Sequence, residues 1–322
     1  MNSRRTFIKQ LATATAYSQF SWLTACQSKT KQIPDNLSTS LPLKLSLAQW
    51  SIHRALEEGS LKAIDFAAIA KKYEFTAIEY VNGFYREHAT DEAYWNNLKR
   101  RADDQGVQNL LIMVDEEGDL GNPFDADRVK AVENHYQWIH AASLLGCHSI
   151  RVNAFGDGGK EDVQKAMIVS MGQLCEYAAK ANINVIIENH GLYSSDGTWV
   201  AEIMRQVNKP NCGTLPDFGN WCLSAKWGTT QIECAEVYDR YQGVADFLPF
   251  AKGVSAKSYA FNEAGEETRI DYARMLKLVK DSGFQGHIGV EFEGFDMSEA
   301  DGIVATKTLL EKTWQKVGES NS

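Results

Sequence analysis

The sequence has no surplus of basic residues: 33 Lys and Arg stand against 42 Asp and Glu, which gives a net charge of −9. A protein that binds a phosphate backbone needs a Lys/Arg surplus on at least one face, so this balance argues against a nucleic-acid partner. Beyond residue 26, no apolar run is long enough to cross a bilayer as a helix. With 44% hydrophobic and 23% charged residues, the 322-residue chain is expected to form a sizeable globular core.

Cysteine is scarce and is not arranged for metal binding. No two cysteines form a CxxC pair, and five of the six follow Cys26, an odd number that cannot pair fully within the chain. Cys147 and Cys175 stand in apolar contexts and are predicted to be small buried side chains. A disulfide among the remaining three stays open as an alternative: Cys212, Cys222 and Cys234.

A glycine-rich phosphate loop is also absent after the first predicted strand, where the chain reads Ala48-Gln49-Trp50-Ser51-Ile52-His53. A doubly wound open sheet would be expected to carry such a loop at this point. Short apolar runs, several with β-branched residues, recur from Leu43 onward and predict eight strands. They are Leu43–Trp50, Thr76–Val81, Val107–Val114, Ser149–Asn153, Asn184–Glu188, Cys212–Leu215, Ala251–Ala256 and Ile288–Phe292.

Longer segments with helical spacing separate these strands. They include Leu61–Tyr73, Ala93–Gln105, Ala126–Leu145, Asp162–Ala181 and Tyr272–Ser282. A glycine follows three of them as the expected helix stop: Gly106, Gly146 and Gly283. The strict alternation of strands and helices predicts a single-domain α/β fold, a (β/α)8 TIM barrel, over residues 43–322.

The N-terminal residues carry features of an export signal. Ser3-Arg4-Arg5-Thr6-Phe7-Ile8-Lys9 resembles the twin-arginine (Tat) signal, and the apolar run Leu11–Leu23 is too short to span a bilayer. Leu23-Thr24-Ala25-Cys26 resembles the lipobox of bacterial lipoproteins, which implies lipidation of Cys26. We therefore expect a signal over residues 1–26, a flexible tether over 27–42, and a periplasmic barrel that meets the membrane only through its lipid anchor. A non-lipidated signal with a chance cysteine is the alternative.

Polar side chains gather at the carboxyl ends of the predicted strands, where barrel enzymes build their active sites. The apolar run Val185-Ile186-Ile187 shows this best, since it ends abruptly in Glu188-Asn189-His190. In chain order the strand ends carry Gln49 and Trp50, Glu79, Asp115 and Glu116, Arg151 and Asn153, Glu188 to His190, Asp217 and Asn220, Ser255 and Lys257, and Glu291 and Glu293.

Carboxylates that converge on one mouth repel one another unless a cation lies between them. Oxygen ligands favour Mg²⁺ or Mn²⁺ over Zn²⁺. Glu188, Asp217 and Glu291 are therefore the candidate metal ligands, at the ends of strands five, six and eight. The alternative for each carboxylate is a salt bridge at the barrel rim.

Four motifs resemble the sugar phosphate isomerase/epimerase group of xylose-isomerase-like barrels: Ile187-Glu188-Asn189-His190, Leu215–Asn220, Ser255–Tyr259 and Ile288–Gly294. Metal-dependent epimerases of that superfamily take Glu, Asp, His and Glu ligands from strands five to eight. The resemblance places these on Glu188, Asp217, Ser255 and Glu291, so three match, but serine is a poor ligand for a divalent ion. His190 or water is the candidate for the missing ligand. Mn²⁺ is the expected ion, with Mg²⁺ and Co²⁺ as alternatives.

The resemblance also implies proton abstraction next to a carbonyl. Glu188 and Glu291 would flank the substrate carbon as base and acid, and the metal would stabilise the enediolate. Lys257 is predicted to share a face with Ser255 and to point into the mouth as a third catalytic candidate. Substrate contacts are assigned to Trp50, Glu79, Arg151, Asn153, His190 and Asn220, and Trp221 is a further candidate for stacking on a sugar face.

These features predict a metal-dependent isomerase or epimerase of a neutral sugar, a keto-sugar or a keto-glycoside, because no phosphate-binding loop is apparent. A lyase that eliminates from a keto-glycoside would use the same enediolate and is an alternative. A non-catalytic sugar-binding lipoprotein is another, motivated by Ser255. Related barrels include apurinic endonucleases, but these use a His-rich zinc cluster, and His190 is the only histidine at a predicted strand end. Nothing in the sequence marks an oligomer interface.

Overall fold

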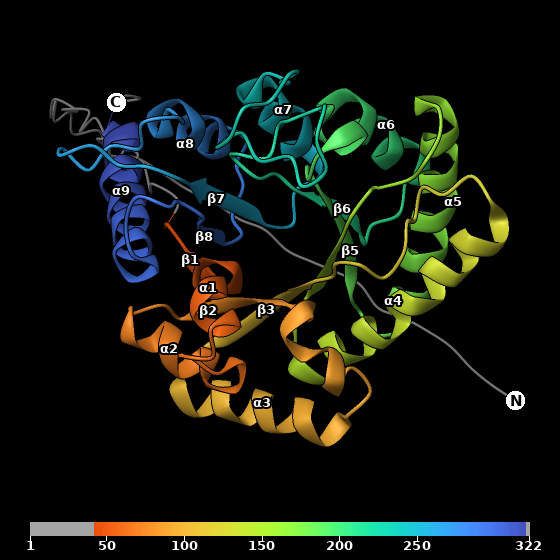
Figure 1. Cartoon of the computed structure of the whole chain (residues 1–322), viewed down its shortest axis with the longest axis horizontal. Coiled ribbons are helices and arrows are strands. Elements are labelled where there is room, and N and C mark those ends of the chain that lie inside the picture. The colour runs from red at the N-terminus through yellow and green to blue at the C-terminus, as the bar shows by residue number, and fades with distance from the viewer. Residues whose placement is uncertain (1–41, 320–322) are drawn as a thin grey trace, which may run out of the picture. The chain divides into compact units, whose positions relative to one another are not determined.

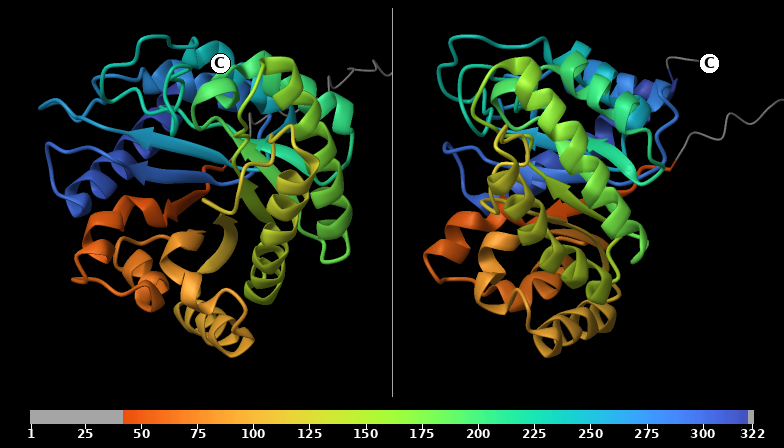
Figure 2. Two further views of the ribbon diagram at one scale, coloured as in Figure 1. Left: turned by 45° about the vertical axis from the view of Figure 1, so that its right-hand side comes forward. Right: turned by 90° about the vertical axis from the view of Figure 1, so that its right-hand side faces the viewer.

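The computed structural model describes residues 42–319. The predicted signal, with Cys26, and the predicted tether as far as residue 41 lie outside the described residues. Figures 1 and 2 show parallel strands surrounded by helices. The strands are β1 (Leu45–Ala48), β2 (Ala77–Val81), β3 (Gln108–Met113), β4 (Ser149–Val152), β5 (Asn184–Glu188), β6 (Cys212–Leu215), β7 (Val254–Ser258) and β8 (Ile288–Phe292).

Helices follow the strands along the chain. The α-helices are α1 (His53–Glu57), α2 (Phe66–Lys72), α3 (Glu92–Gln105), α4 (Asp125–Leu145), α5 (Lys160–Ala179), α6 (Gly197–Val207), α7 (Arg240–Phe247), α8 (Tyr272–Asp281) and α9 (Glu299–Glu319). Short 3₁₀ helices are η1 (Gln49–Ile52), η2 (Ala63–Asp65), η3 (Asn82–His88), η4 (Leu192–Ser195) and η5 (Leu248–Phe250).

The eight strands form one parallel sheet in the order β6-β5-β4-β3-β2-β1-β8-β7. The first and last strands along the chain are neighbours, since Leu45 of β1 pairs with Ile288 of β8. Isolated parallel bridges, Thr214 to Ala251 and Asp217 to Ser255, join the β6 and β7 sides. This topology confirms the predicted (β/α)8 barrel.

An apolar layer lies inside the ring of strands, separate from the larger core between the strands and the helices. The buried residues of the inner layer are Ala48, Val81, Leu111, Met113, Ile186 and Leu215. Side chains two residues apart on a strand share a face, so Glu188 lies one step beyond Ile186 toward the carboxyl end of β5. The inner layer therefore supports the polar residues at the strand ends from below.

The predicted strand boundaries agree with the structure at β5, β6 and β8, and elsewhere lie within two residues of it, except at β7. The predicted start of the seventh strand at Ala251 is wrong, because its partner β8 begins at Ile288, opposite Val254. The pairing continues to Ser258, opposite Phe292, and includes Lys257 opposite Glu291. Lys257 is thus held inside a strand rather than beyond its end.

Capping residues fix the starts and the ends of several helices. Asp side chains accept hydrogen bonds from backbone N–H groups at the starts of α3, α6, α7 and α8: Asp91, Asp196, Asp239 and Asp271. Gly106 and Gly146 end α3 and α4 with φ angles of 63° and 75°, as predicted for helix stops.

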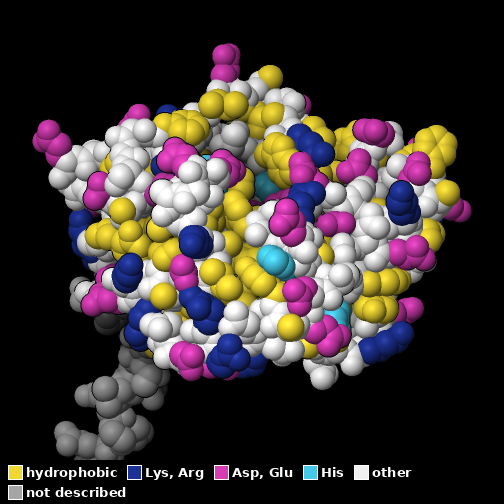
Figure 3. All heavy atoms as spheres, turned by 60° about the horizontal axis from the view of Figure 1, so that its bottom comes forward, with side chains coloured by type: hydrophobic (Ala, Val, Ile, Leu, Met, Phe, Trp, Pro, Cys, Tyr) yellow, Lys and Arg dark blue, Asp and Glu magenta, His cyan; other side chains and the backbone are white. Residues whose placement is uncertain are grey.

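Acidic and basic side chains are interspersed, with apolar side chains between them, on the face of the molecule that Figure 3 shows. This face therefore has no continuous patch made of acidic side chains alone or of basic side chains alone. Within residues 42–319, none of the helices combines the length and the apolar character needed to span a membrane.

Candidate functional site

A cavity of about 570 Å³ opens at the carboxyl ends of the strands. Val81 and Met113, members of the inner apolar layer, contribute to its wall. The other residues that line it are Trp50, Glu57, Gly83, Arg86, Asp115, Glu116, Arg151, His190, Trp227, Thr229, Lys257, Glu291 and Glu293. Its position is that of active sites in barrel enzymes.

Three buried carboxylates meet at the base of this mouth. Glu188 is the last residue of β5, Asp217 follows β6, and Glu291 lies on β8. One oxygen of each lies within 4.8 Å of the others, and all three residues are buried. We call Glu188, Asp217 and Glu291 the carboxylate triad. The structure brings together the three residues that the strand-end pattern selected as metal ligands.

Two buried cations flank the carboxylate triad from opposite sides. Lys257 Nζ lies 2.9 Å from Glu291 Oε1 and 3.2 Å from Glu293 Oε2. Arg151 Nε lies 2.7 Å from Glu188 Oε2, and its Nη1 lies 2.5 Å from Asp115 Oδ1. Both side chains are about 3% exposed, so their charges are poorly screened by water.

Ser255 links two members of the triad. Its Oγ lies 2.7 Å from Asp217 Oδ2 and 2.7 Å from Glu291 Oε2. A serine hydroxyl has one proton and can donate to only one of these oxygens at a time. Ser255 therefore holds the two carboxylates together from β7.

Hydrogen bonds from the neighbouring loop orient Asp217. Its Oδ1 accepts from the backbone N–H groups of Gly219 at 2.7 Å and Asn220 at 2.8 Å. The Asn189 side chain donates to the backbone oxygen of Asp217 and accepts from its N–H, at 3.0 and 2.7 Å. Gly219 is required here, because a Cβ at this position would lie 2.3 Å from the Tyr259 hydroxyl.

Burial and neighbouring charges shift the pKa values of these groups. Burial raises the pKa of Asp217 to about 6, against the opposing effect of Lys257. Burial also raises the pKa of Glu188 well above its ordinary range, although Arg151 acts to lower it. Burial opposes the charge of Lys257, but Glu291 and the other nearby carboxylates outweigh it and raise its pKa. The cluster thus favours a charged Lys257, and burial favours the protonated forms of Glu188 and Asp217.

Arg151 also organises the residues near His190. Burial alone would raise the pKa of Asp115, but Arg151 and His190 outweigh it and lower that pKa to about 2. Asn153 Nδ2 donates to Asp115 Oδ1 at 2.7 Å, and Asn153 Oδ1 lies 2.7 Å from His190 Nδ1. Burial, reinforced by Arg151, lowers the pKa of His190 well below its usual value.

His190 stands in the cavity wall rather than in the carboxylate triad. Its ring lies 5.0 Å from the ring of Trp227 and 6.3 Å from that of Phe155, measured between centroids. The group of residues able to hold a metal contains the three carboxylates and does not include His190. The structure therefore gives no support to His190 as the replacement ligand.

The aromatic residues divide between the cavity and the core. Trp50 lines the cavity, stacks on His53 at 4.4 Å and donates from Nε1 to Glu293 Oε1 at 3.0 Å. Trp221 is fully buried and packs against Phe247, so it is not available for stacking on a sugar. Trp227, which no sequence pattern marked, also lines the cavity, from the loop between β6 and α7.

Two contacts hold the loop that carries Trp227. Cys222 and Cys234 form a disulfide, which settles the pairing that the sequence left open. Gly191 packs so closely on the same loop that a Cβ there would lie 2.3 Å from the carbonyl oxygen of Ala225. The position of Trp227 in the cavity wall thus depends on contacts within the β6–α7 loop and between this loop and the residues that follow β5.

Glu79 lies inside the barrel and does not line the cavity. Ser46 Oγ donates to its Oε1 at 2.6 Å, and its Oε2 has no hydrogen-bond partner in the structure. A Cβ at Gly289 would lie 2.8 Å from Glu79 Oε1, so the glycine makes room for this carboxyl group. The geometry does not support the predicted contact between Glu79 and substrate.

The donor set fits a hard divalent cation. The carboxylate triad offers oxygen atoms only, and Asn220 adds a buried amide oxygen, Oδ1, that has no hydrogen-bond partner. The Asn220 amide nitrogen lies 3.4 Å from Glu188 Oε1, which places this amide beside the triad. Carboxylate and amide oxygens are the ligands that Mg²⁺ and Mn²⁺ prefer.

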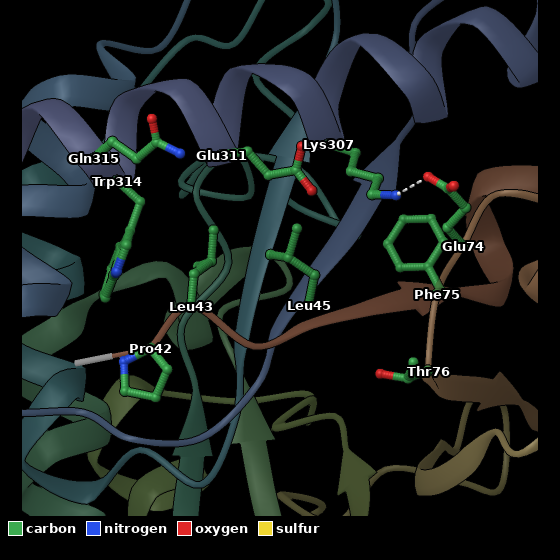
Figure 4. Close-up of a pocket in the computed structure, with 10 residues that line it drawn as sticks. All are labelled: Pro42, Leu43, Leu45, Glu74, Phe75, Thr76, Lys307, Glu311, Trp314 and Gln315. Carbon is green, nitrogen blue, oxygen red and sulfur yellow. Dashed lines mark hydrogen bonds and ion pairs between the residues drawn. The ribbon is translucent and has the colours of Figure 1, made fainter. Parts of the chain in front are cut away.

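A second cavity, of about 590 Å³, lies at the opposite end of the strands, where β1 and β2 begin. Figure 4 shows Lys307 of α9 directed toward Glu74, with 3.2 Å between Nζ and Oε2. Leu43, Leu45 and Phe75 contribute apolar side chains. The two cavities share no lining residue.

A family model described as Xylose isomerase-like TIM barrel matches residues 67–313. Among solved structures, the apo form of 3-keto-D-glucoside 4-epimerase from E. coli is 12% identical, with 84% of this chain and 100% of that chain covered and a TM-score of 0.60. D-psicose 3-epimerase with D-tagatose from Clostridium cellulolyticum H10 is 13% identical, with 86% and 96% covered and a TM-score of 0.60.

A xylose isomerase-like TIM barrel protein from Mycobacterium smegmatis, solved in complex with magnesium, is 14% identical to this chain. The likeness covers 88% of this chain and 98% of that chain, with a TM-score of 0.60. At these identities the likeness establishes the fold alone. Among curated protein sequences, none matches this chain significantly.

Proposed function

This chain belongs to the xylose isomerase-like TIM barrel family, and from that membership we propose that it is a sugar isomerase or epimerase. The reaction would begin with removal of a proton next to a carbonyl group. The observation that carries this proposal is the buried triad of Glu188, Asp217 and Glu291 beneath an open cavity. Burial raises the pKa values of Glu188 and Asp217, and carboxyl groups with raised pKa values beside a cleft are suited to general acid–base catalysis.

Glu188 and Glu291 are the proposed base and acid. One carboxylate takes the proton from the substrate carbon, and the C–H electron pair forms the carbon–carbon double bond of an enediolate as the carbonyl oxygen gains negative charge. Protonation of the same carbon from the opposite face gives the epimer, and protonation of the neighbouring carbon gives the isomer. The two glutamates come from β5 and β8, which lets them approach a substrate from different sides.

The carboxylate triad, with the Asn220 amide oxygen beside it, would hold a divalent cation. We propose Mn²⁺, with Mg²⁺ and Co²⁺ as alternatives. A bound divalent ion supplies Lewis-acid polarisation of a carbonyl oxygen. Lys257 pairs with Glu291 Oε1 and Arg151 pairs with Glu188 Oε2, so each glutamate has one oxygen next to a buried cation of the protein.

Residues in the cavity wall and directly beside it are proposed to bind and orient the substrate. Trp50 and Trp227 present aromatic surfaces on which an apolar face of a sugar ring can stack. Asn153 and His190 form a hydrogen-bonded pair next to Arg151 and are placed to contact substrate hydroxyl groups. Bound carbohydrate would in this way be held without any phosphate-binding loop.

A neutral sugar, a keto-sugar or a keto-glycoside is the proposed substrate class. The structural neighbours support it, since their names include a 3-keto-D-glucoside 4-epimerase and a D-psicose 3-epimerase. The same proton abstraction on a keto-glycoside leads to elimination when a leaving group stands on the adjacent carbon. A lyase is therefore the second candidate reaction for this site.

Hydrogen exchange tests the proposal. The purified protein is incubated with Mn²⁺ and a panel of keto-sugars and keto-glycosides in D₂O, and deuterium at carbon is followed by NMR. We expect uptake with the wild type and a loss of at least about 100-fold with Glu188→Gln and Glu291→Gln. Glu161→Gln, an exposed substitution on α5, is the matched control. No uptake across the panel by the wild type would refute proton abstraction.

A sugar-binding lipoprotein without catalysis is the alternative from another class. The polar partners that surround the triad, Ser255 above all, are the observation that favours it. This alternative predicts that a sugar raises the melting temperature while no deuterium enters the sugar. The exchange experiment, run beside thermal denaturation, separates the two functions.

We also propose that the protein is exported by the twin-arginine route and lipid-anchored at Cys26. The Cys222–Cys234 disulfide supports an oxidising compartment, where such bonds persist. Membrane fractionation tests this: Cys26→Ala should move the protein from the membrane to the soluble periplasmic fraction. Retention of this variant in the membrane would contradict anchoring at Cys26.

A further inference from the structure

Each oxygen of the carboxylate triad lies close to a polar group of the protein, although Glu188 Oε2 has an ion pair and no hydrogen bond. Glu291 Oε1 accepts from Lys257 Nζ at 2.9 Å, and Glu291 Oε2 lies 2.7 Å from Ser255 Oγ. Asp217 Oδ2 also lies 2.7 Å from Ser255 Oγ, while Asp217 Oδ1 accepts two backbone N–H groups. Glu188 Oε2 pairs with Arg151, and Glu188 Oε1 lies 3.4 Å from Asn220 Nδ2.

Lys257 is the partner that bears most directly on cation binding. Its ammonium group lies 4.0 Å from Asp217 Oδ2 as well as 2.9 Å from Glu291 Oε1, so it faces two of the three carboxylates. The ladder between β7 and β8 pairs Lys257 with Glu291 and fixes this approach. Glu293 holds the ammonium from the other side, at 3.2 Å.

Neither Lys257 nor Ser255, the two β7 residues that contact the triad, is a good ligand for a divalent cation. An ammonium group has three donors and no lone pair, and a serine hydroxyl is a weak ligand beside a carboxylate. A second cation next to the triad also repels an incoming one, and the repulsion is strong because Lys257 is buried. On its β7 side, the triad therefore contacts a cation that belongs to the protein, the Lys257 ammonium group.

We propose that Lys257 is the resident counter-cation of the carboxylate triad and that it weakens the binding of divalent metal ions there. Ser255 completes this arrangement by bridging Asp217 and Glu291 on the same side. The inference deepens the proposed function, since it concerns the cation that the same site would use. It implies that the triad binds metal with lower affinity than three buried carboxylates would otherwise give.

Calorimetric titration with MnCl₂ and MgCl₂ tests this inference on the wild type and on Lys257 variants. Lys257→Met removes the charge and should tighten Mn²⁺ binding at least about tenfold. Lys257→Arg keeps the charge and should stay within about threefold of the wild type. Lys165→Met, which removes an exposed lysine of α5, controls for the general loss of one positive charge.

A Ser255 variant tests whether Ser255, which bridges Asp217 and Glu291, lies at the cation site. Ser255→His places an imidazole against two oxygens of the triad and should tighten Zn²⁺ binding at least about tenfold more than Mg²⁺ binding, because imidazole is a softer ligand. Equal effects on the two ions would contradict the assignment of Ser255 to the cation site.

The result that overturns the inference is a Lys257→Met protein that is folded by circular dichroism and binds Mn²⁺ no more tightly than the wild type. If Lys257→Met and Lys257→Gln both fail to fold, the affinity of the wild-type protein for Mn²⁺ tests the inference. A Mn²⁺ dissociation constant weaker than about 1 μM supports a competing ammonium group, and a tighter one refutes it. Deuterium exchange judges the proposed reaction independently, so failure of one proposal is distinguishable from failure of the other.

Discussion

Replacing Glu79 with Gln should change how stability depends on pH. Glu79 is 1% exposed inside the barrel, and one of its oxygens lacks a hydrogen-bond partner. Burial raises its pKa from the ordinary 4.5 to about 7, with the hydrogen bond from Ser46 acting in the opposite direction. The barrel interior thus favours the protonated, neutral form of this carboxyl group.

The sign of the effect follows from proton binding in the two states. Between pH 4.5 and about 7, the folded state holds a proton on Glu79 that the unfolded chain has lost. The stability that this group contributes is therefore fully present below pH 4.5 and is lost as the pH rises through about 7. At about 1.4 kcal/mol for each pKa unit, the loss amounts to about 3 kcal/mol.

Urea unfolding followed by circular dichroism, at several pH values from 4 to 8.5, measures this loss. Gln keeps the shape and the oxygen that Ser46 contacts but cannot ionise. We expect Glu79→Gln to gain about 3 kcal/mol over the wild type between pH 4 and pH 8. Glu161→Gln is the matched control for the removal of one carboxylate. If the difference between Glu79→Gln and the wild type stays constant over this range, the reasoning about Glu79 is wrong.

Three further changes probe the site and its supports. Arg151→Met leaves buried carboxylates without their cation and should lower the free energy of unfolding by about 3–5 kcal/mol, measured by urea titration. Cys222→Ser removes the bond to Cys234, which closes a loop of about 13 residues, and should cost about 3 kcal/mol, measured by calorimetry with and without reductant. Gly243→Ala places a Cβ 2.1 Å from Trp221 and should destabilise by about 1–3 kcal/mol, with altered near-ultraviolet circular dichroism.

Each of these changes has a contrary outcome. A loss below about 1 kcal/mol for Arg151→Met would mean that water reaches the carboxylates that the structure buries. An unchanged melting temperature on reduction would mean that the disulfide does not restrain the loop. A wild-type near-ultraviolet spectrum for Gly243→Ala would show that α7 can move away from Trp221 at little cost.

Most of the strands could be predicted from the apolar runs in the sequence. The apolar run that ends at Glu188 predicted β5 to the residue, and the pattern at Ile288–Phe292 did the same for β8. Both runs are buried on both faces in the barrel, so their composition directly reflects their environment. The seventh strand was placed too early, because its start depends on where the neighbouring β8 begins rather than on its own residues.

The site residues that could be predicted are those that lie at the carboxyl end of a predicted strand. Glu188, Asp217 and Glu291 were selected as strand-end residues, and the parallel order of the barrel brings such ends together. Trp227 was missed, since it lies in a long loop whose path depends on Gly191 and on the Cys222–Cys234 disulfide.

The sequence by itself determined the alternation of strands and helices and the identity of the acidic strand ends, because both depend on residues close together in the chain. Only the tertiary structure decided that Lys257 and Ser255 contact the triad, that His190 turns to Asn153, and that Glu79 is enclosed within the barrel. These outcomes depend on distances between side chains from different strands. Such distances are fixed by the register and closure of the sheet, which no single segment of the sequence encodes.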